Sequence, residues 1–109
     1  MSTTVTIEQS TERAEFIRVG GLVQGVGFRP TVWRLAQRYG MRGSVSNDGQ
    51  GVSIHVCGAA DVIDGFVQAL THEAPPLARV DRIDRAPATN LPTDAAFRIV
   101  ASGDRKSVV

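Results

Sequence analysis

The sequence has 109 residues, 42% of them hydrophobic, which suffices for one small domain with its own core and excludes a chain that is disordered throughout. Twelve basic and eleven acidic residues give a formal net charge of +1, which argues against a polybasic nucleic-acid or membrane binder. The single cysteine excludes an intramolecular disulfide, and no apolar run approaches the roughly 18 residues of a membrane span.

The first predicted elements are a tail, a strand and a helix. Residues 1–13 are polar and lack periodicity, so we expect a flexible tail. Residues 15–19 (EFIRV) are predicted to form a strand. Residues 29–39 are predicted to form a helix, because apolar side chains recur there at the spacing of one helix face. These side chains are Val32, Leu35, Ala36 and Tyr39. Pro30 suits the first turn of this helix, and Gly40 suits its C-terminal cap.

The second half of the chain continues the alternation of strands and helices. The predicted elements are an extended segment at 42–47, a hairpin turn at 48–51, a strand at 52–57, a helix at 60–73 and strands at 79–85 and 96–101. Asp48 and Gly49 favour the turn, because an Asp-Gly pair readily supplies positive φ angles. Val52, Ile54 and Val56 alternate with more polar neighbours, which indicates a strand with one buried face.

This order of elements predicts an α+β fold. The order β-α-β-β-α-β is that of the ferredoxin-like sandwich, in which an antiparallel sheet carries two helices on one face. The sequence leaves room for an additional short strand. We therefore expect one folded domain over residues 14–101, and residues 102–109 have the composition of the start of a linker.

A glycine-rich connection between the first strand and the first helix carries the strongest chemical signal. Its sequence is GLVQGVGFRP, residues 21–30. Glycines let the backbone approach a ligand closely, and successive N–H groups at a helix N-terminus can hold an anion. Arg29 lies at that terminus, where its charge opposes the helix dipole unless an anion binds. Taken alone, the segment fits a tight turn beside a solvated Arg better than a site, and it matches neither a P-loop nor a dinucleotide fingerprint.

Two longer motifs resemble the signatures of the acylphosphatase family. Residues 21–29 match the approximate family pattern G-x-V-Q-G-V-x-F-R. Residues 43–51 (GSVSNDGQG) match the second pattern, G-x-V-x-N-x-x-x-G-x-V, as far as its last glycine, and Ser53 stands where the pattern has its final Val. The resemblance spans residues 14–101 and implies the β-α-β-β-α-β order that the periodicity predicts.

The resemblance also implies a phosphate site with two catalytic residues, Arg29 and Asn47. Arg29 would bind the phosphoryl oxygens together with the backbone N–H groups of Gln24, Gly25, Val26, Gly27 and Phe28. Asn47 would orient the attacking water, although taken alone it fits a turn residue before Asp48 and Gly49 better. The chemistry agrees, because acyl phosphate hydrolysis needs charge stabilisation and an in-line water but no strong base or metal. An amide can accept from and donate to one water at once.

A narrower resemblance links the chain to the N-terminal domain of the HypF family, the carbamoyltransferases of nickel–iron hydrogenase maturation. The matching segments are 27–30 (GFRP), 32–36 (VWRLA), 47–49 (NDG), 75–83 (PPLARVDRI) and 97–102 (FRIVAS). The resemblance implies that carbamoyl phosphate, or a related acyl phosphate, is the substrate. It also implies downstream HypF domains, which would use ATP and zinc and pass the carbamoyl group to HypE for cyanide ligand synthesis.

The remaining expectations concern cofactors, location and an alternative function. Cys57, His55 and His72 are too few for a structural zinc site, so we expect no metal and no cofactor in this domain. We expect a cytoplasmic location, because the N-terminus lacks the apolar centre of a signal peptide. No nucleic-acid or membrane partner is expected. The alternative function is a non-catalytic module that binds or docks on phosphate or carbamoyl phosphate.

Overall fold

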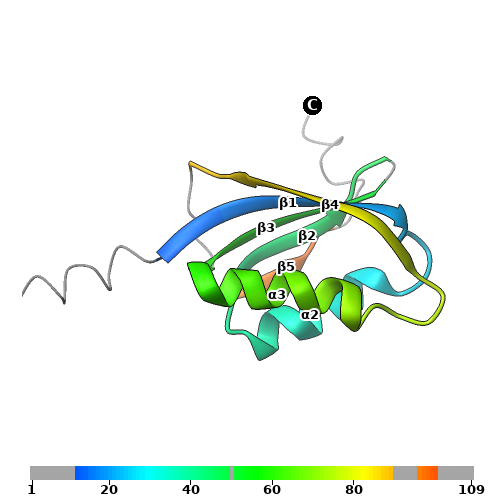
Figure 1. Ribbon diagram of the computed structural model, residues 1–109, viewed down its shortest axis with the longest axis horizontal. Helices are drawn as coiled ribbons and strands as arrows, with labels where there is room; N and C mark the ends of the chain where they lie inside the picture. The colour runs from blue at the N-terminus through cyan, green and yellow to red at the C-terminus, as the bar shows by residue number, and fades with distance from the viewer. Residues whose placement is uncertain (1–11, 50, 90–95, 101–109) are drawn as a thin grey trace, which may run out of the picture.

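The computed structural model describes residues 12–49, 51–89 and 96–100, which form one sheet and two helices (Figure 1). The elements in chain order are β1 (Glu12–Leu22), α2 (Phe28–Arg38), β2 (Arg42–Asn47), β3 (Gly51–Ala59), α3 (Ala60–His72), β4 (Arg79–Pro87) and β5 (Phe97–Ile99). The predicted α+β fold and its β-α-β-β-α-β order are confirmed, and β5 is the additional short strand.

The five strands lie in the order β4-β1-β3-β2-β5. The expected antiparallel arrangement holds for β4, β1, β3 and β2, whereas β5 runs parallel to β2 at the edge of the sheet. Strands β1 and β2 therefore point the same way on either side of β3, and the residues that follow them lie at the same end of the sheet. Figure 1 shows the β1–α2 connection and the β2–β3 turn at that end.

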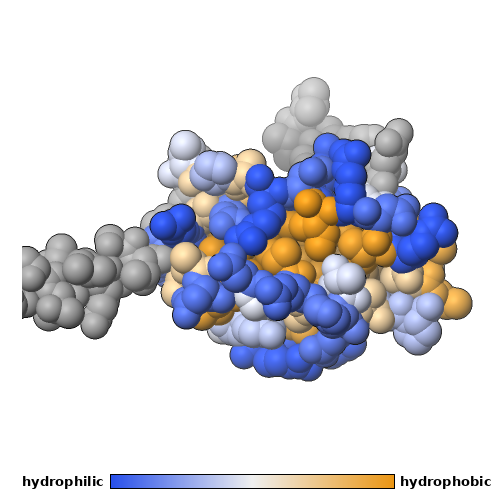
Figure 2. Space-filling view, viewed as in Figure 1, coloured by the Kyte–Doolittle hydropathy of each residue, from blue (hydrophilic) through white to orange (hydrophobic). Residues whose placement is uncertain are grey.

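The core lies between the sheet and its two helices. Val52, Ile54 and Val56 of β3 are buried as their alternation predicts, and they face Phe66 and Leu70 of α3, which are also buried. Apolar residues gather along the seam between the helices and the sheet (Figure 2). This packing stabilises the fold through the removal of apolar surface from water.

In the described part of the chain, no helix covers the other face of the sheet. Phe16 and His55 lie directly opposite each other on β1 and β3, and their rings stack with centroids 4.5 Å apart. His55 is thus partly buried by an aromatic neighbour and lies on the face away from α2 and α3. Cys57, on the same side of β3, is 1% exposed, because Arg42 reaches over it with Nη2 3.1 Å from Sγ.

Several element boundaries differ from the sequence prediction. Strand β1 begins at Glu12, inside the segment expected as a tail, because Glu12 and Arg13 pair with Ala59 and Gly58 of β3. Strand β4 continues to Pro87, which pairs with Glu15. The rest of the expected tail, the end of the strand expected at 96–101 and the expected linker lie outside the described residues. Within the described part of the chain, neither helix is long and apolar enough to cross a membrane.

Candidate functional site

The loop between β1 and α2 exposes backbone in a conformation that only glycine adopts readily. Gly25 and Gly27 have φ angles of 75° and 82°, and Gly27 is the N-cap of α2. A Cβ built on either glycine would meet nothing within 4 Å, so the backbone here borders open space. On either side of the glycines, buried Val23 and Phe28 anchor the loop in the core.

The backbone N–H groups of this loop find no acceptor among the residues that the structure describes. No hydrogen bond joins the backbone N–H groups of residues 24–29 to any other described residue. These groups include the first N–H groups of α2, which a helix leaves unsatisfied and which carry the positive end of its dipole. The loop therefore presents a set of unused donors to open space, and an anion is the ligand that such a set favours.

Arg29 adds a positive charge beside these donors. It lies in the first turn of α2, which contains no acidic residue, and its side chain is partly exposed. Among the described residues, no carboxylate forms an ion pair with Arg29. A cation at this position interacts unfavourably with the positive end of the helix dipole. A bound anion would interact favourably with both the Arg29 guanidinium and the helix N-terminus.

Asn47 contributes an unused acceptor from the second motif. It is the last residue of β2 and pairs with Val52, whose side chain is buried on the helix-covered face, so Asn47 lies on that face too. Its Oδ1 is buried and has no hydrogen-bond partner among the described residues. Burying an acceptor without a partner costs about 1–3 kcal/mol of folding free energy. A water donating to Oδ1 would remove that cost.

Gln24 connects the two motifs. Its Nε2 donates to the carbonyl oxygen of Gly51 at 2.8 Å and lies 3.4 Å from that of Gly49. Gly51 O also accepts the N–H of Asp48, the residue that follows Asn47. The loop that carries Arg29 and the turn next to Asn47 are therefore joined by one hydrogen-bond cluster.

This side-chain contact is the feature that the sequence prediction missed. The sequence placed Gln24 in the phosphate site through its backbone N–H alone. The approach of its side chain to carbonyl groups 25 and 27 residues later depends on the register of β1, β3 and β2, which no local pattern reveals. The nearby ion pair of Asp48 with Arg18, at 3.3 Å, was also not predicted.

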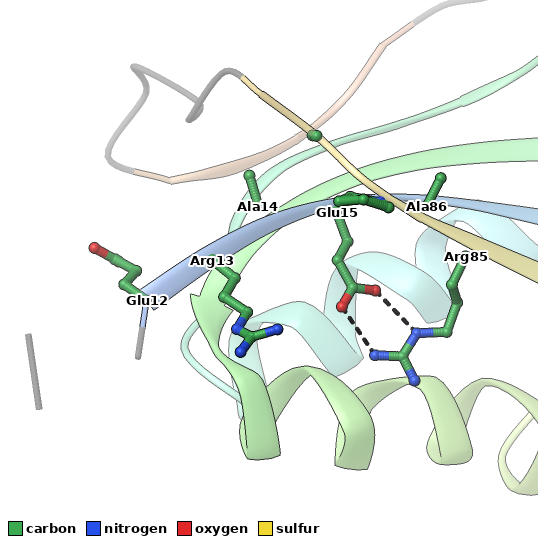
Figure 3. A pocket seen from close by; sticks show the side chains of 8 residues that line it. Glu12, Arg13, Ala14, Glu15, Arg85 and Ala86 are labelled. Carbon is green, nitrogen blue, oxygen red and sulfur yellow. Dashed lines mark hydrogen bonds and ion pairs between the residues drawn. The ribbon is translucent and has the colours of Figure 1, made fainter. Parts of the chain in front are cut away.

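A second region with clustered charges lies at the other end of the sheet. A cavity of about 510 Å³ is lined there by the start of β1 and the end of β4 (Figure 3). Arg85 donates to both oxygens of Glu15, at 2.9 and 3.0 Å, and to Asp64 of α3 at 2.9 Å. The hydrogen bond that Arg85 donates to Glu15 raises the pKa of Arg85. The Arg85 and Glu15 charges here are already paired inside the protein.

The other residues considered in the sequence lie away from this site. His55 faces the open side of the sheet, and His72 sits at the end of α3 with Nδ1 2.9 Å from the carbonyl oxygen of Gln68. Burial raises the pKa of the Cys57 thiol. The described residues contain no cluster of three or more potential metal ligands from His, Cys, Asp and Glu.

Comparison with known proteins matches residues 15–99 to the family model described as Acylphosphatase. A carbamoyltransferase HypF of Rhodobacter capsulatus is 53% identical over 87 residues, which are 80% of this chain and 11% of that protein. An acylphosphatase of Azoarcus sp. is 43% identical over 88 residues, which are 80% of this chain and 87% of that protein.

A solved structure gives the same likeness to HypF. The crystal structure of full-length HypF in its phosphate- and nucleotide-bound form superposes with a TM-score of 0.77 and 34% identity, covering 83% of this chain and 12% of that one. The chain thus spans about a tenth of the length of the HypF proteins that it matches and most of the length of the small acylphosphatase.

Proposed function

Because the chain belongs to the acylphosphatase family of hydrolases, we propose that it hydrolyses carbamoyl phosphate or a related acyl phosphate at the 24–29 loop. The observation that carries this proposal is the buried, unpaired Oδ1 of Asn47. It is tied through Gly51 and Gln24 to a loop whose N–H groups are also unused. Unused donors suit the phosphoryl group, and the unused acceptor suits a water.

The proposed reaction needs only these groups. The loop N–H groups and the Arg29 guanidinium bind the phosphoryl oxygens and stabilise the charge that develops on them. A water donates one hydrogen bond to Oδ1 of Asn47 and attacks phosphorus in line with the acyl oxygen. The new P–O bond forms from this water as the bond to the acyl oxygen breaks, and carbamate leaves with the electron pair. The water's proton passes to solvent or to the departing carboxylate, which is a good leaving group, so no strong base is required.

The likeness to HypF supports a place for this reaction in a longer protein. We infer that the chain is the part of a carbamoyltransferase that hydrolyses carbamoyl phosphate. Further domains would use ATP and zinc and would transfer the carbamoyl group to HypE. The 53% identity to one HypF and the small share of that protein that is matched support this inference. A cytoplasmic location is part of it. Restoration of hydrogenase maturation by this chain fused to a HypF that lacks the matching segment would test it.

The direct test measures phosphate release by the purified chain from carbamoyl phosphate and from acetyl phosphate. Replacing Arg29 with Ala should lower kcat/KM about 100- to 1,000-fold, because one preorganised charge donor is lost. Arg34→Ala is the matched control, since Arg34 is an exposed residue of the same helix whose side chain bonds Thr31 within that helix. Equal rates for Arg29→Ala and Arg34→Ala would refute the assignment of Arg29.

The same experiment separates hydrolysis from binding alone. Titration with inorganic phosphate should show binding that Arg29→Ala abolishes and Arg34→Ala preserves. If the chain binds phosphate in this way but releases none from either acyl phosphate, the alternative of a non-catalytic binding module is correct.

A further inference from the structure

The side chain of Gln24 lies between the two halves of the proposed site rather than in either of them. Gln24 follows buried Val23, the first residue after β1, and it is partly buried itself. Its Nε2 donates to the carbonyl oxygen of Gly51 at 2.8 Å, and the carbonyl oxygen of Gly49 is 3.4 Å away. Both acceptors belong to the β2–β3 hairpin, whose turn starts immediately after Asn47.

The hairpin is held closely against β1 at this point. Gly51 pairs with Gly20, and a Cβ on Gly51 would collide with the carbonyl oxygen of Val19. Because Gly51 has no side chain, its carbonyl group comes within reach of Gln24. That one oxygen accepts from both Gln24 and the N–H of Asp48, so the bond that closes the turn and the bond to the loop share an acceptor.

The turn is also fixed from its other side. The carboxylate of Asp48 accepts a hydrogen bond of 2.5 Å from Ser53 Oγ and forms an ion pair of 3.3 Å with Arg18. Asp48 is therefore held by neighbours on both β1 and β3. Gln24 supplies the only side-chain hydrogen bonds between the described residues of the loop and those of the turn.

We propose that the Gln24 side chain is a positioning residue that sets the distance between the phosphate bound by the loop and the Oδ1 of Asn47. This inference rests on the proposed function. An in-line attack tolerates little displacement, and a shift of about 1 Å can cost a factor of about 100 in rate. Losing the Gln24 contact should therefore affect turnover much more than phosphate affinity, because the loop keeps its own N–H groups and Arg29.

The test variant is Gln24→Met, which keeps the length of the side chain but removes the donor. Its matched control is Gln37→Met, at an exposed position of α2. We expect Gln24→Met to lower kcat for acyl phosphate hydrolysis about 10- to 100-fold. The Kd for inorganic phosphate should change less than about threefold, and the urea midpoint should match that of the control. A kcat within twofold of Gln37→Met would overturn the proposal.

A double-mutant cycle separates positioning from general damage to the site. If Gln24 acts through Asn47, then Gln24→Met in an Asn47→Ala background should lower kcat less than about twofold further, because the group that it positions is absent. A loss as large as in the wild-type background would show that Gln24 acts independently of Asn47, and the proposal would fall.

A measurement without substrate keeps this inference distinct from the proposed function. Hydrogen exchange of the Asp48 amide, which donates to Gly51 O, should be at least about fivefold faster in Gln24→Met, because a constraint on the opening of that turn is lost. The Gly40 amide, which donates to Gln37 O, should exchange at an unchanged rate. If the wild type neither binds phosphate nor hydrolyses acyl phosphates, the proposed function fails. Unchanged exchange at Asp48 refutes the positioning role whether or not the chain is active.

Discussion

The two ends of the sheet differ in whether their polar groups have partners within the protein. At one end, Arg85 satisfies Glu15 and Asp64 around a cavity of about 510 Å³. At the other end, no internal partner reaches Arg29 or the Asn47 oxygen among the described residues, although Arg29 lies in α2 and Asn47 in β2. The charges of the first region are paired within the protein and stabilise the fold. The polar groups of the second region have no internal partner and can still bind a ligand.

The contrast separates two criteria for a site, which are unused hydrogen-bonding capacity and the volume of a cavity, and the proposed site rests on the first. The cavity at the start of β1 offers space, but its Arg85 and Glu15 charges are already compensated (Figure 3). The loop offers uncompensated donors on exposed backbone, where a small anion needs no deep cavity.

The largest effect is expected at Asn47. Asn47→Ala should lower kcat about 100- to 1,000-fold, as the loss of a preorganised polar group in a catalytic site does. Phosphate affinity should persist, because the loop and Arg29 are intact. The free energy of unfolding should stay equal or rise by up to about 1 kcal/mol, since an unpaired buried acceptor is removed. Phosphate release kinetics, calorimetry and urea unfolding measure the three quantities. A less stable protein with unchanged kcat would assign Asn47 to the structure and not to the chemistry.

The second prediction compares two glycines that both have positive φ angles but lie in different surroundings. Gly27 and Gly40 lie before and after α2 with φ angles of 82° and 66°, and a Cβ on either would meet nothing within 4 Å. Gly27→Ala and Gly40→Ala should each lower the free energy of unfolding by roughly 1–2 kcal/mol. Only Gly27→Ala should weaken phosphate binding, by about 10-fold or more, because its methyl group enters the space beside the loop donors. Equal phosphate affinities in the two variants would show that the anion does not bind at this loop.

The third prediction concerns the paired end of the sheet. Arg85→Met leaves Glu15, whose side chain is only 15% exposed, without its bidentate partner. The free energy of unfolding should fall by about 1–2 kcal/mol, less than for a fully buried pair because Arg85 is about one-third exposed. The kcat for acyl phosphates should not change. Arg82→Met is the control on the same strand, since its pair with Asp84 is well exposed and should contribute little. A fall in kcat with Arg85→Met would contradict the separation of the two ends.

Much of this arrangement can be predicted from the sequence. Apolar periodicity places α2 and α3 to within one residue at each end. The resemblance to the family motifs predicts Arg29 and Asn47 as site residues, and the structure places them at the start of α2 and the end of β2. The rest depends on partners distant in sequence. The Gln24 contact requires the register of three strands, and the burial of Cys57 on the helix-free face requires Arg42 to cover it. The unpaired state of Asn47 Oδ1 depends on which groups fail to reach it, and no local pattern records that.

The smallest effect is expected at an exposed ion pair that joins the ends of the two helices. Arg38 Nη1 lies 2.6 Å from Glu73 Oε2, and this hydrogen bond holds the pKa of the Glu73 carboxyl below its ordinary value. A carboxyl with a lowered pKa in the folded state stabilises the protein above its unfolded pKa, and this contribution is lost as the pH falls through the folded pKa. Because both side chains are well exposed, the effect on the unfolding midpoint should be slight.

The sharper readout of that pair is the titration itself, followed by NMR at the Glu73 side-chain carboxyl carbon. Arg38→Gln should raise the pKa of Glu73 toward its ordinary value, because the hydrogen bond and the attraction to the guanidinium both disappear. Arg82→Gln should leave this titration unchanged, since Arg82 pairs with Asp84. Hydrolysis of acyl phosphate at neutral pH should be the same in both variants, because the charge of Arg38 is already compensated by Glu73. If Arg38→Gln slowed hydrolysis, a charge that is paired within the protein would contribute to the reaction. Internal pairing would then no longer distinguish structural charges from those of the proposed site.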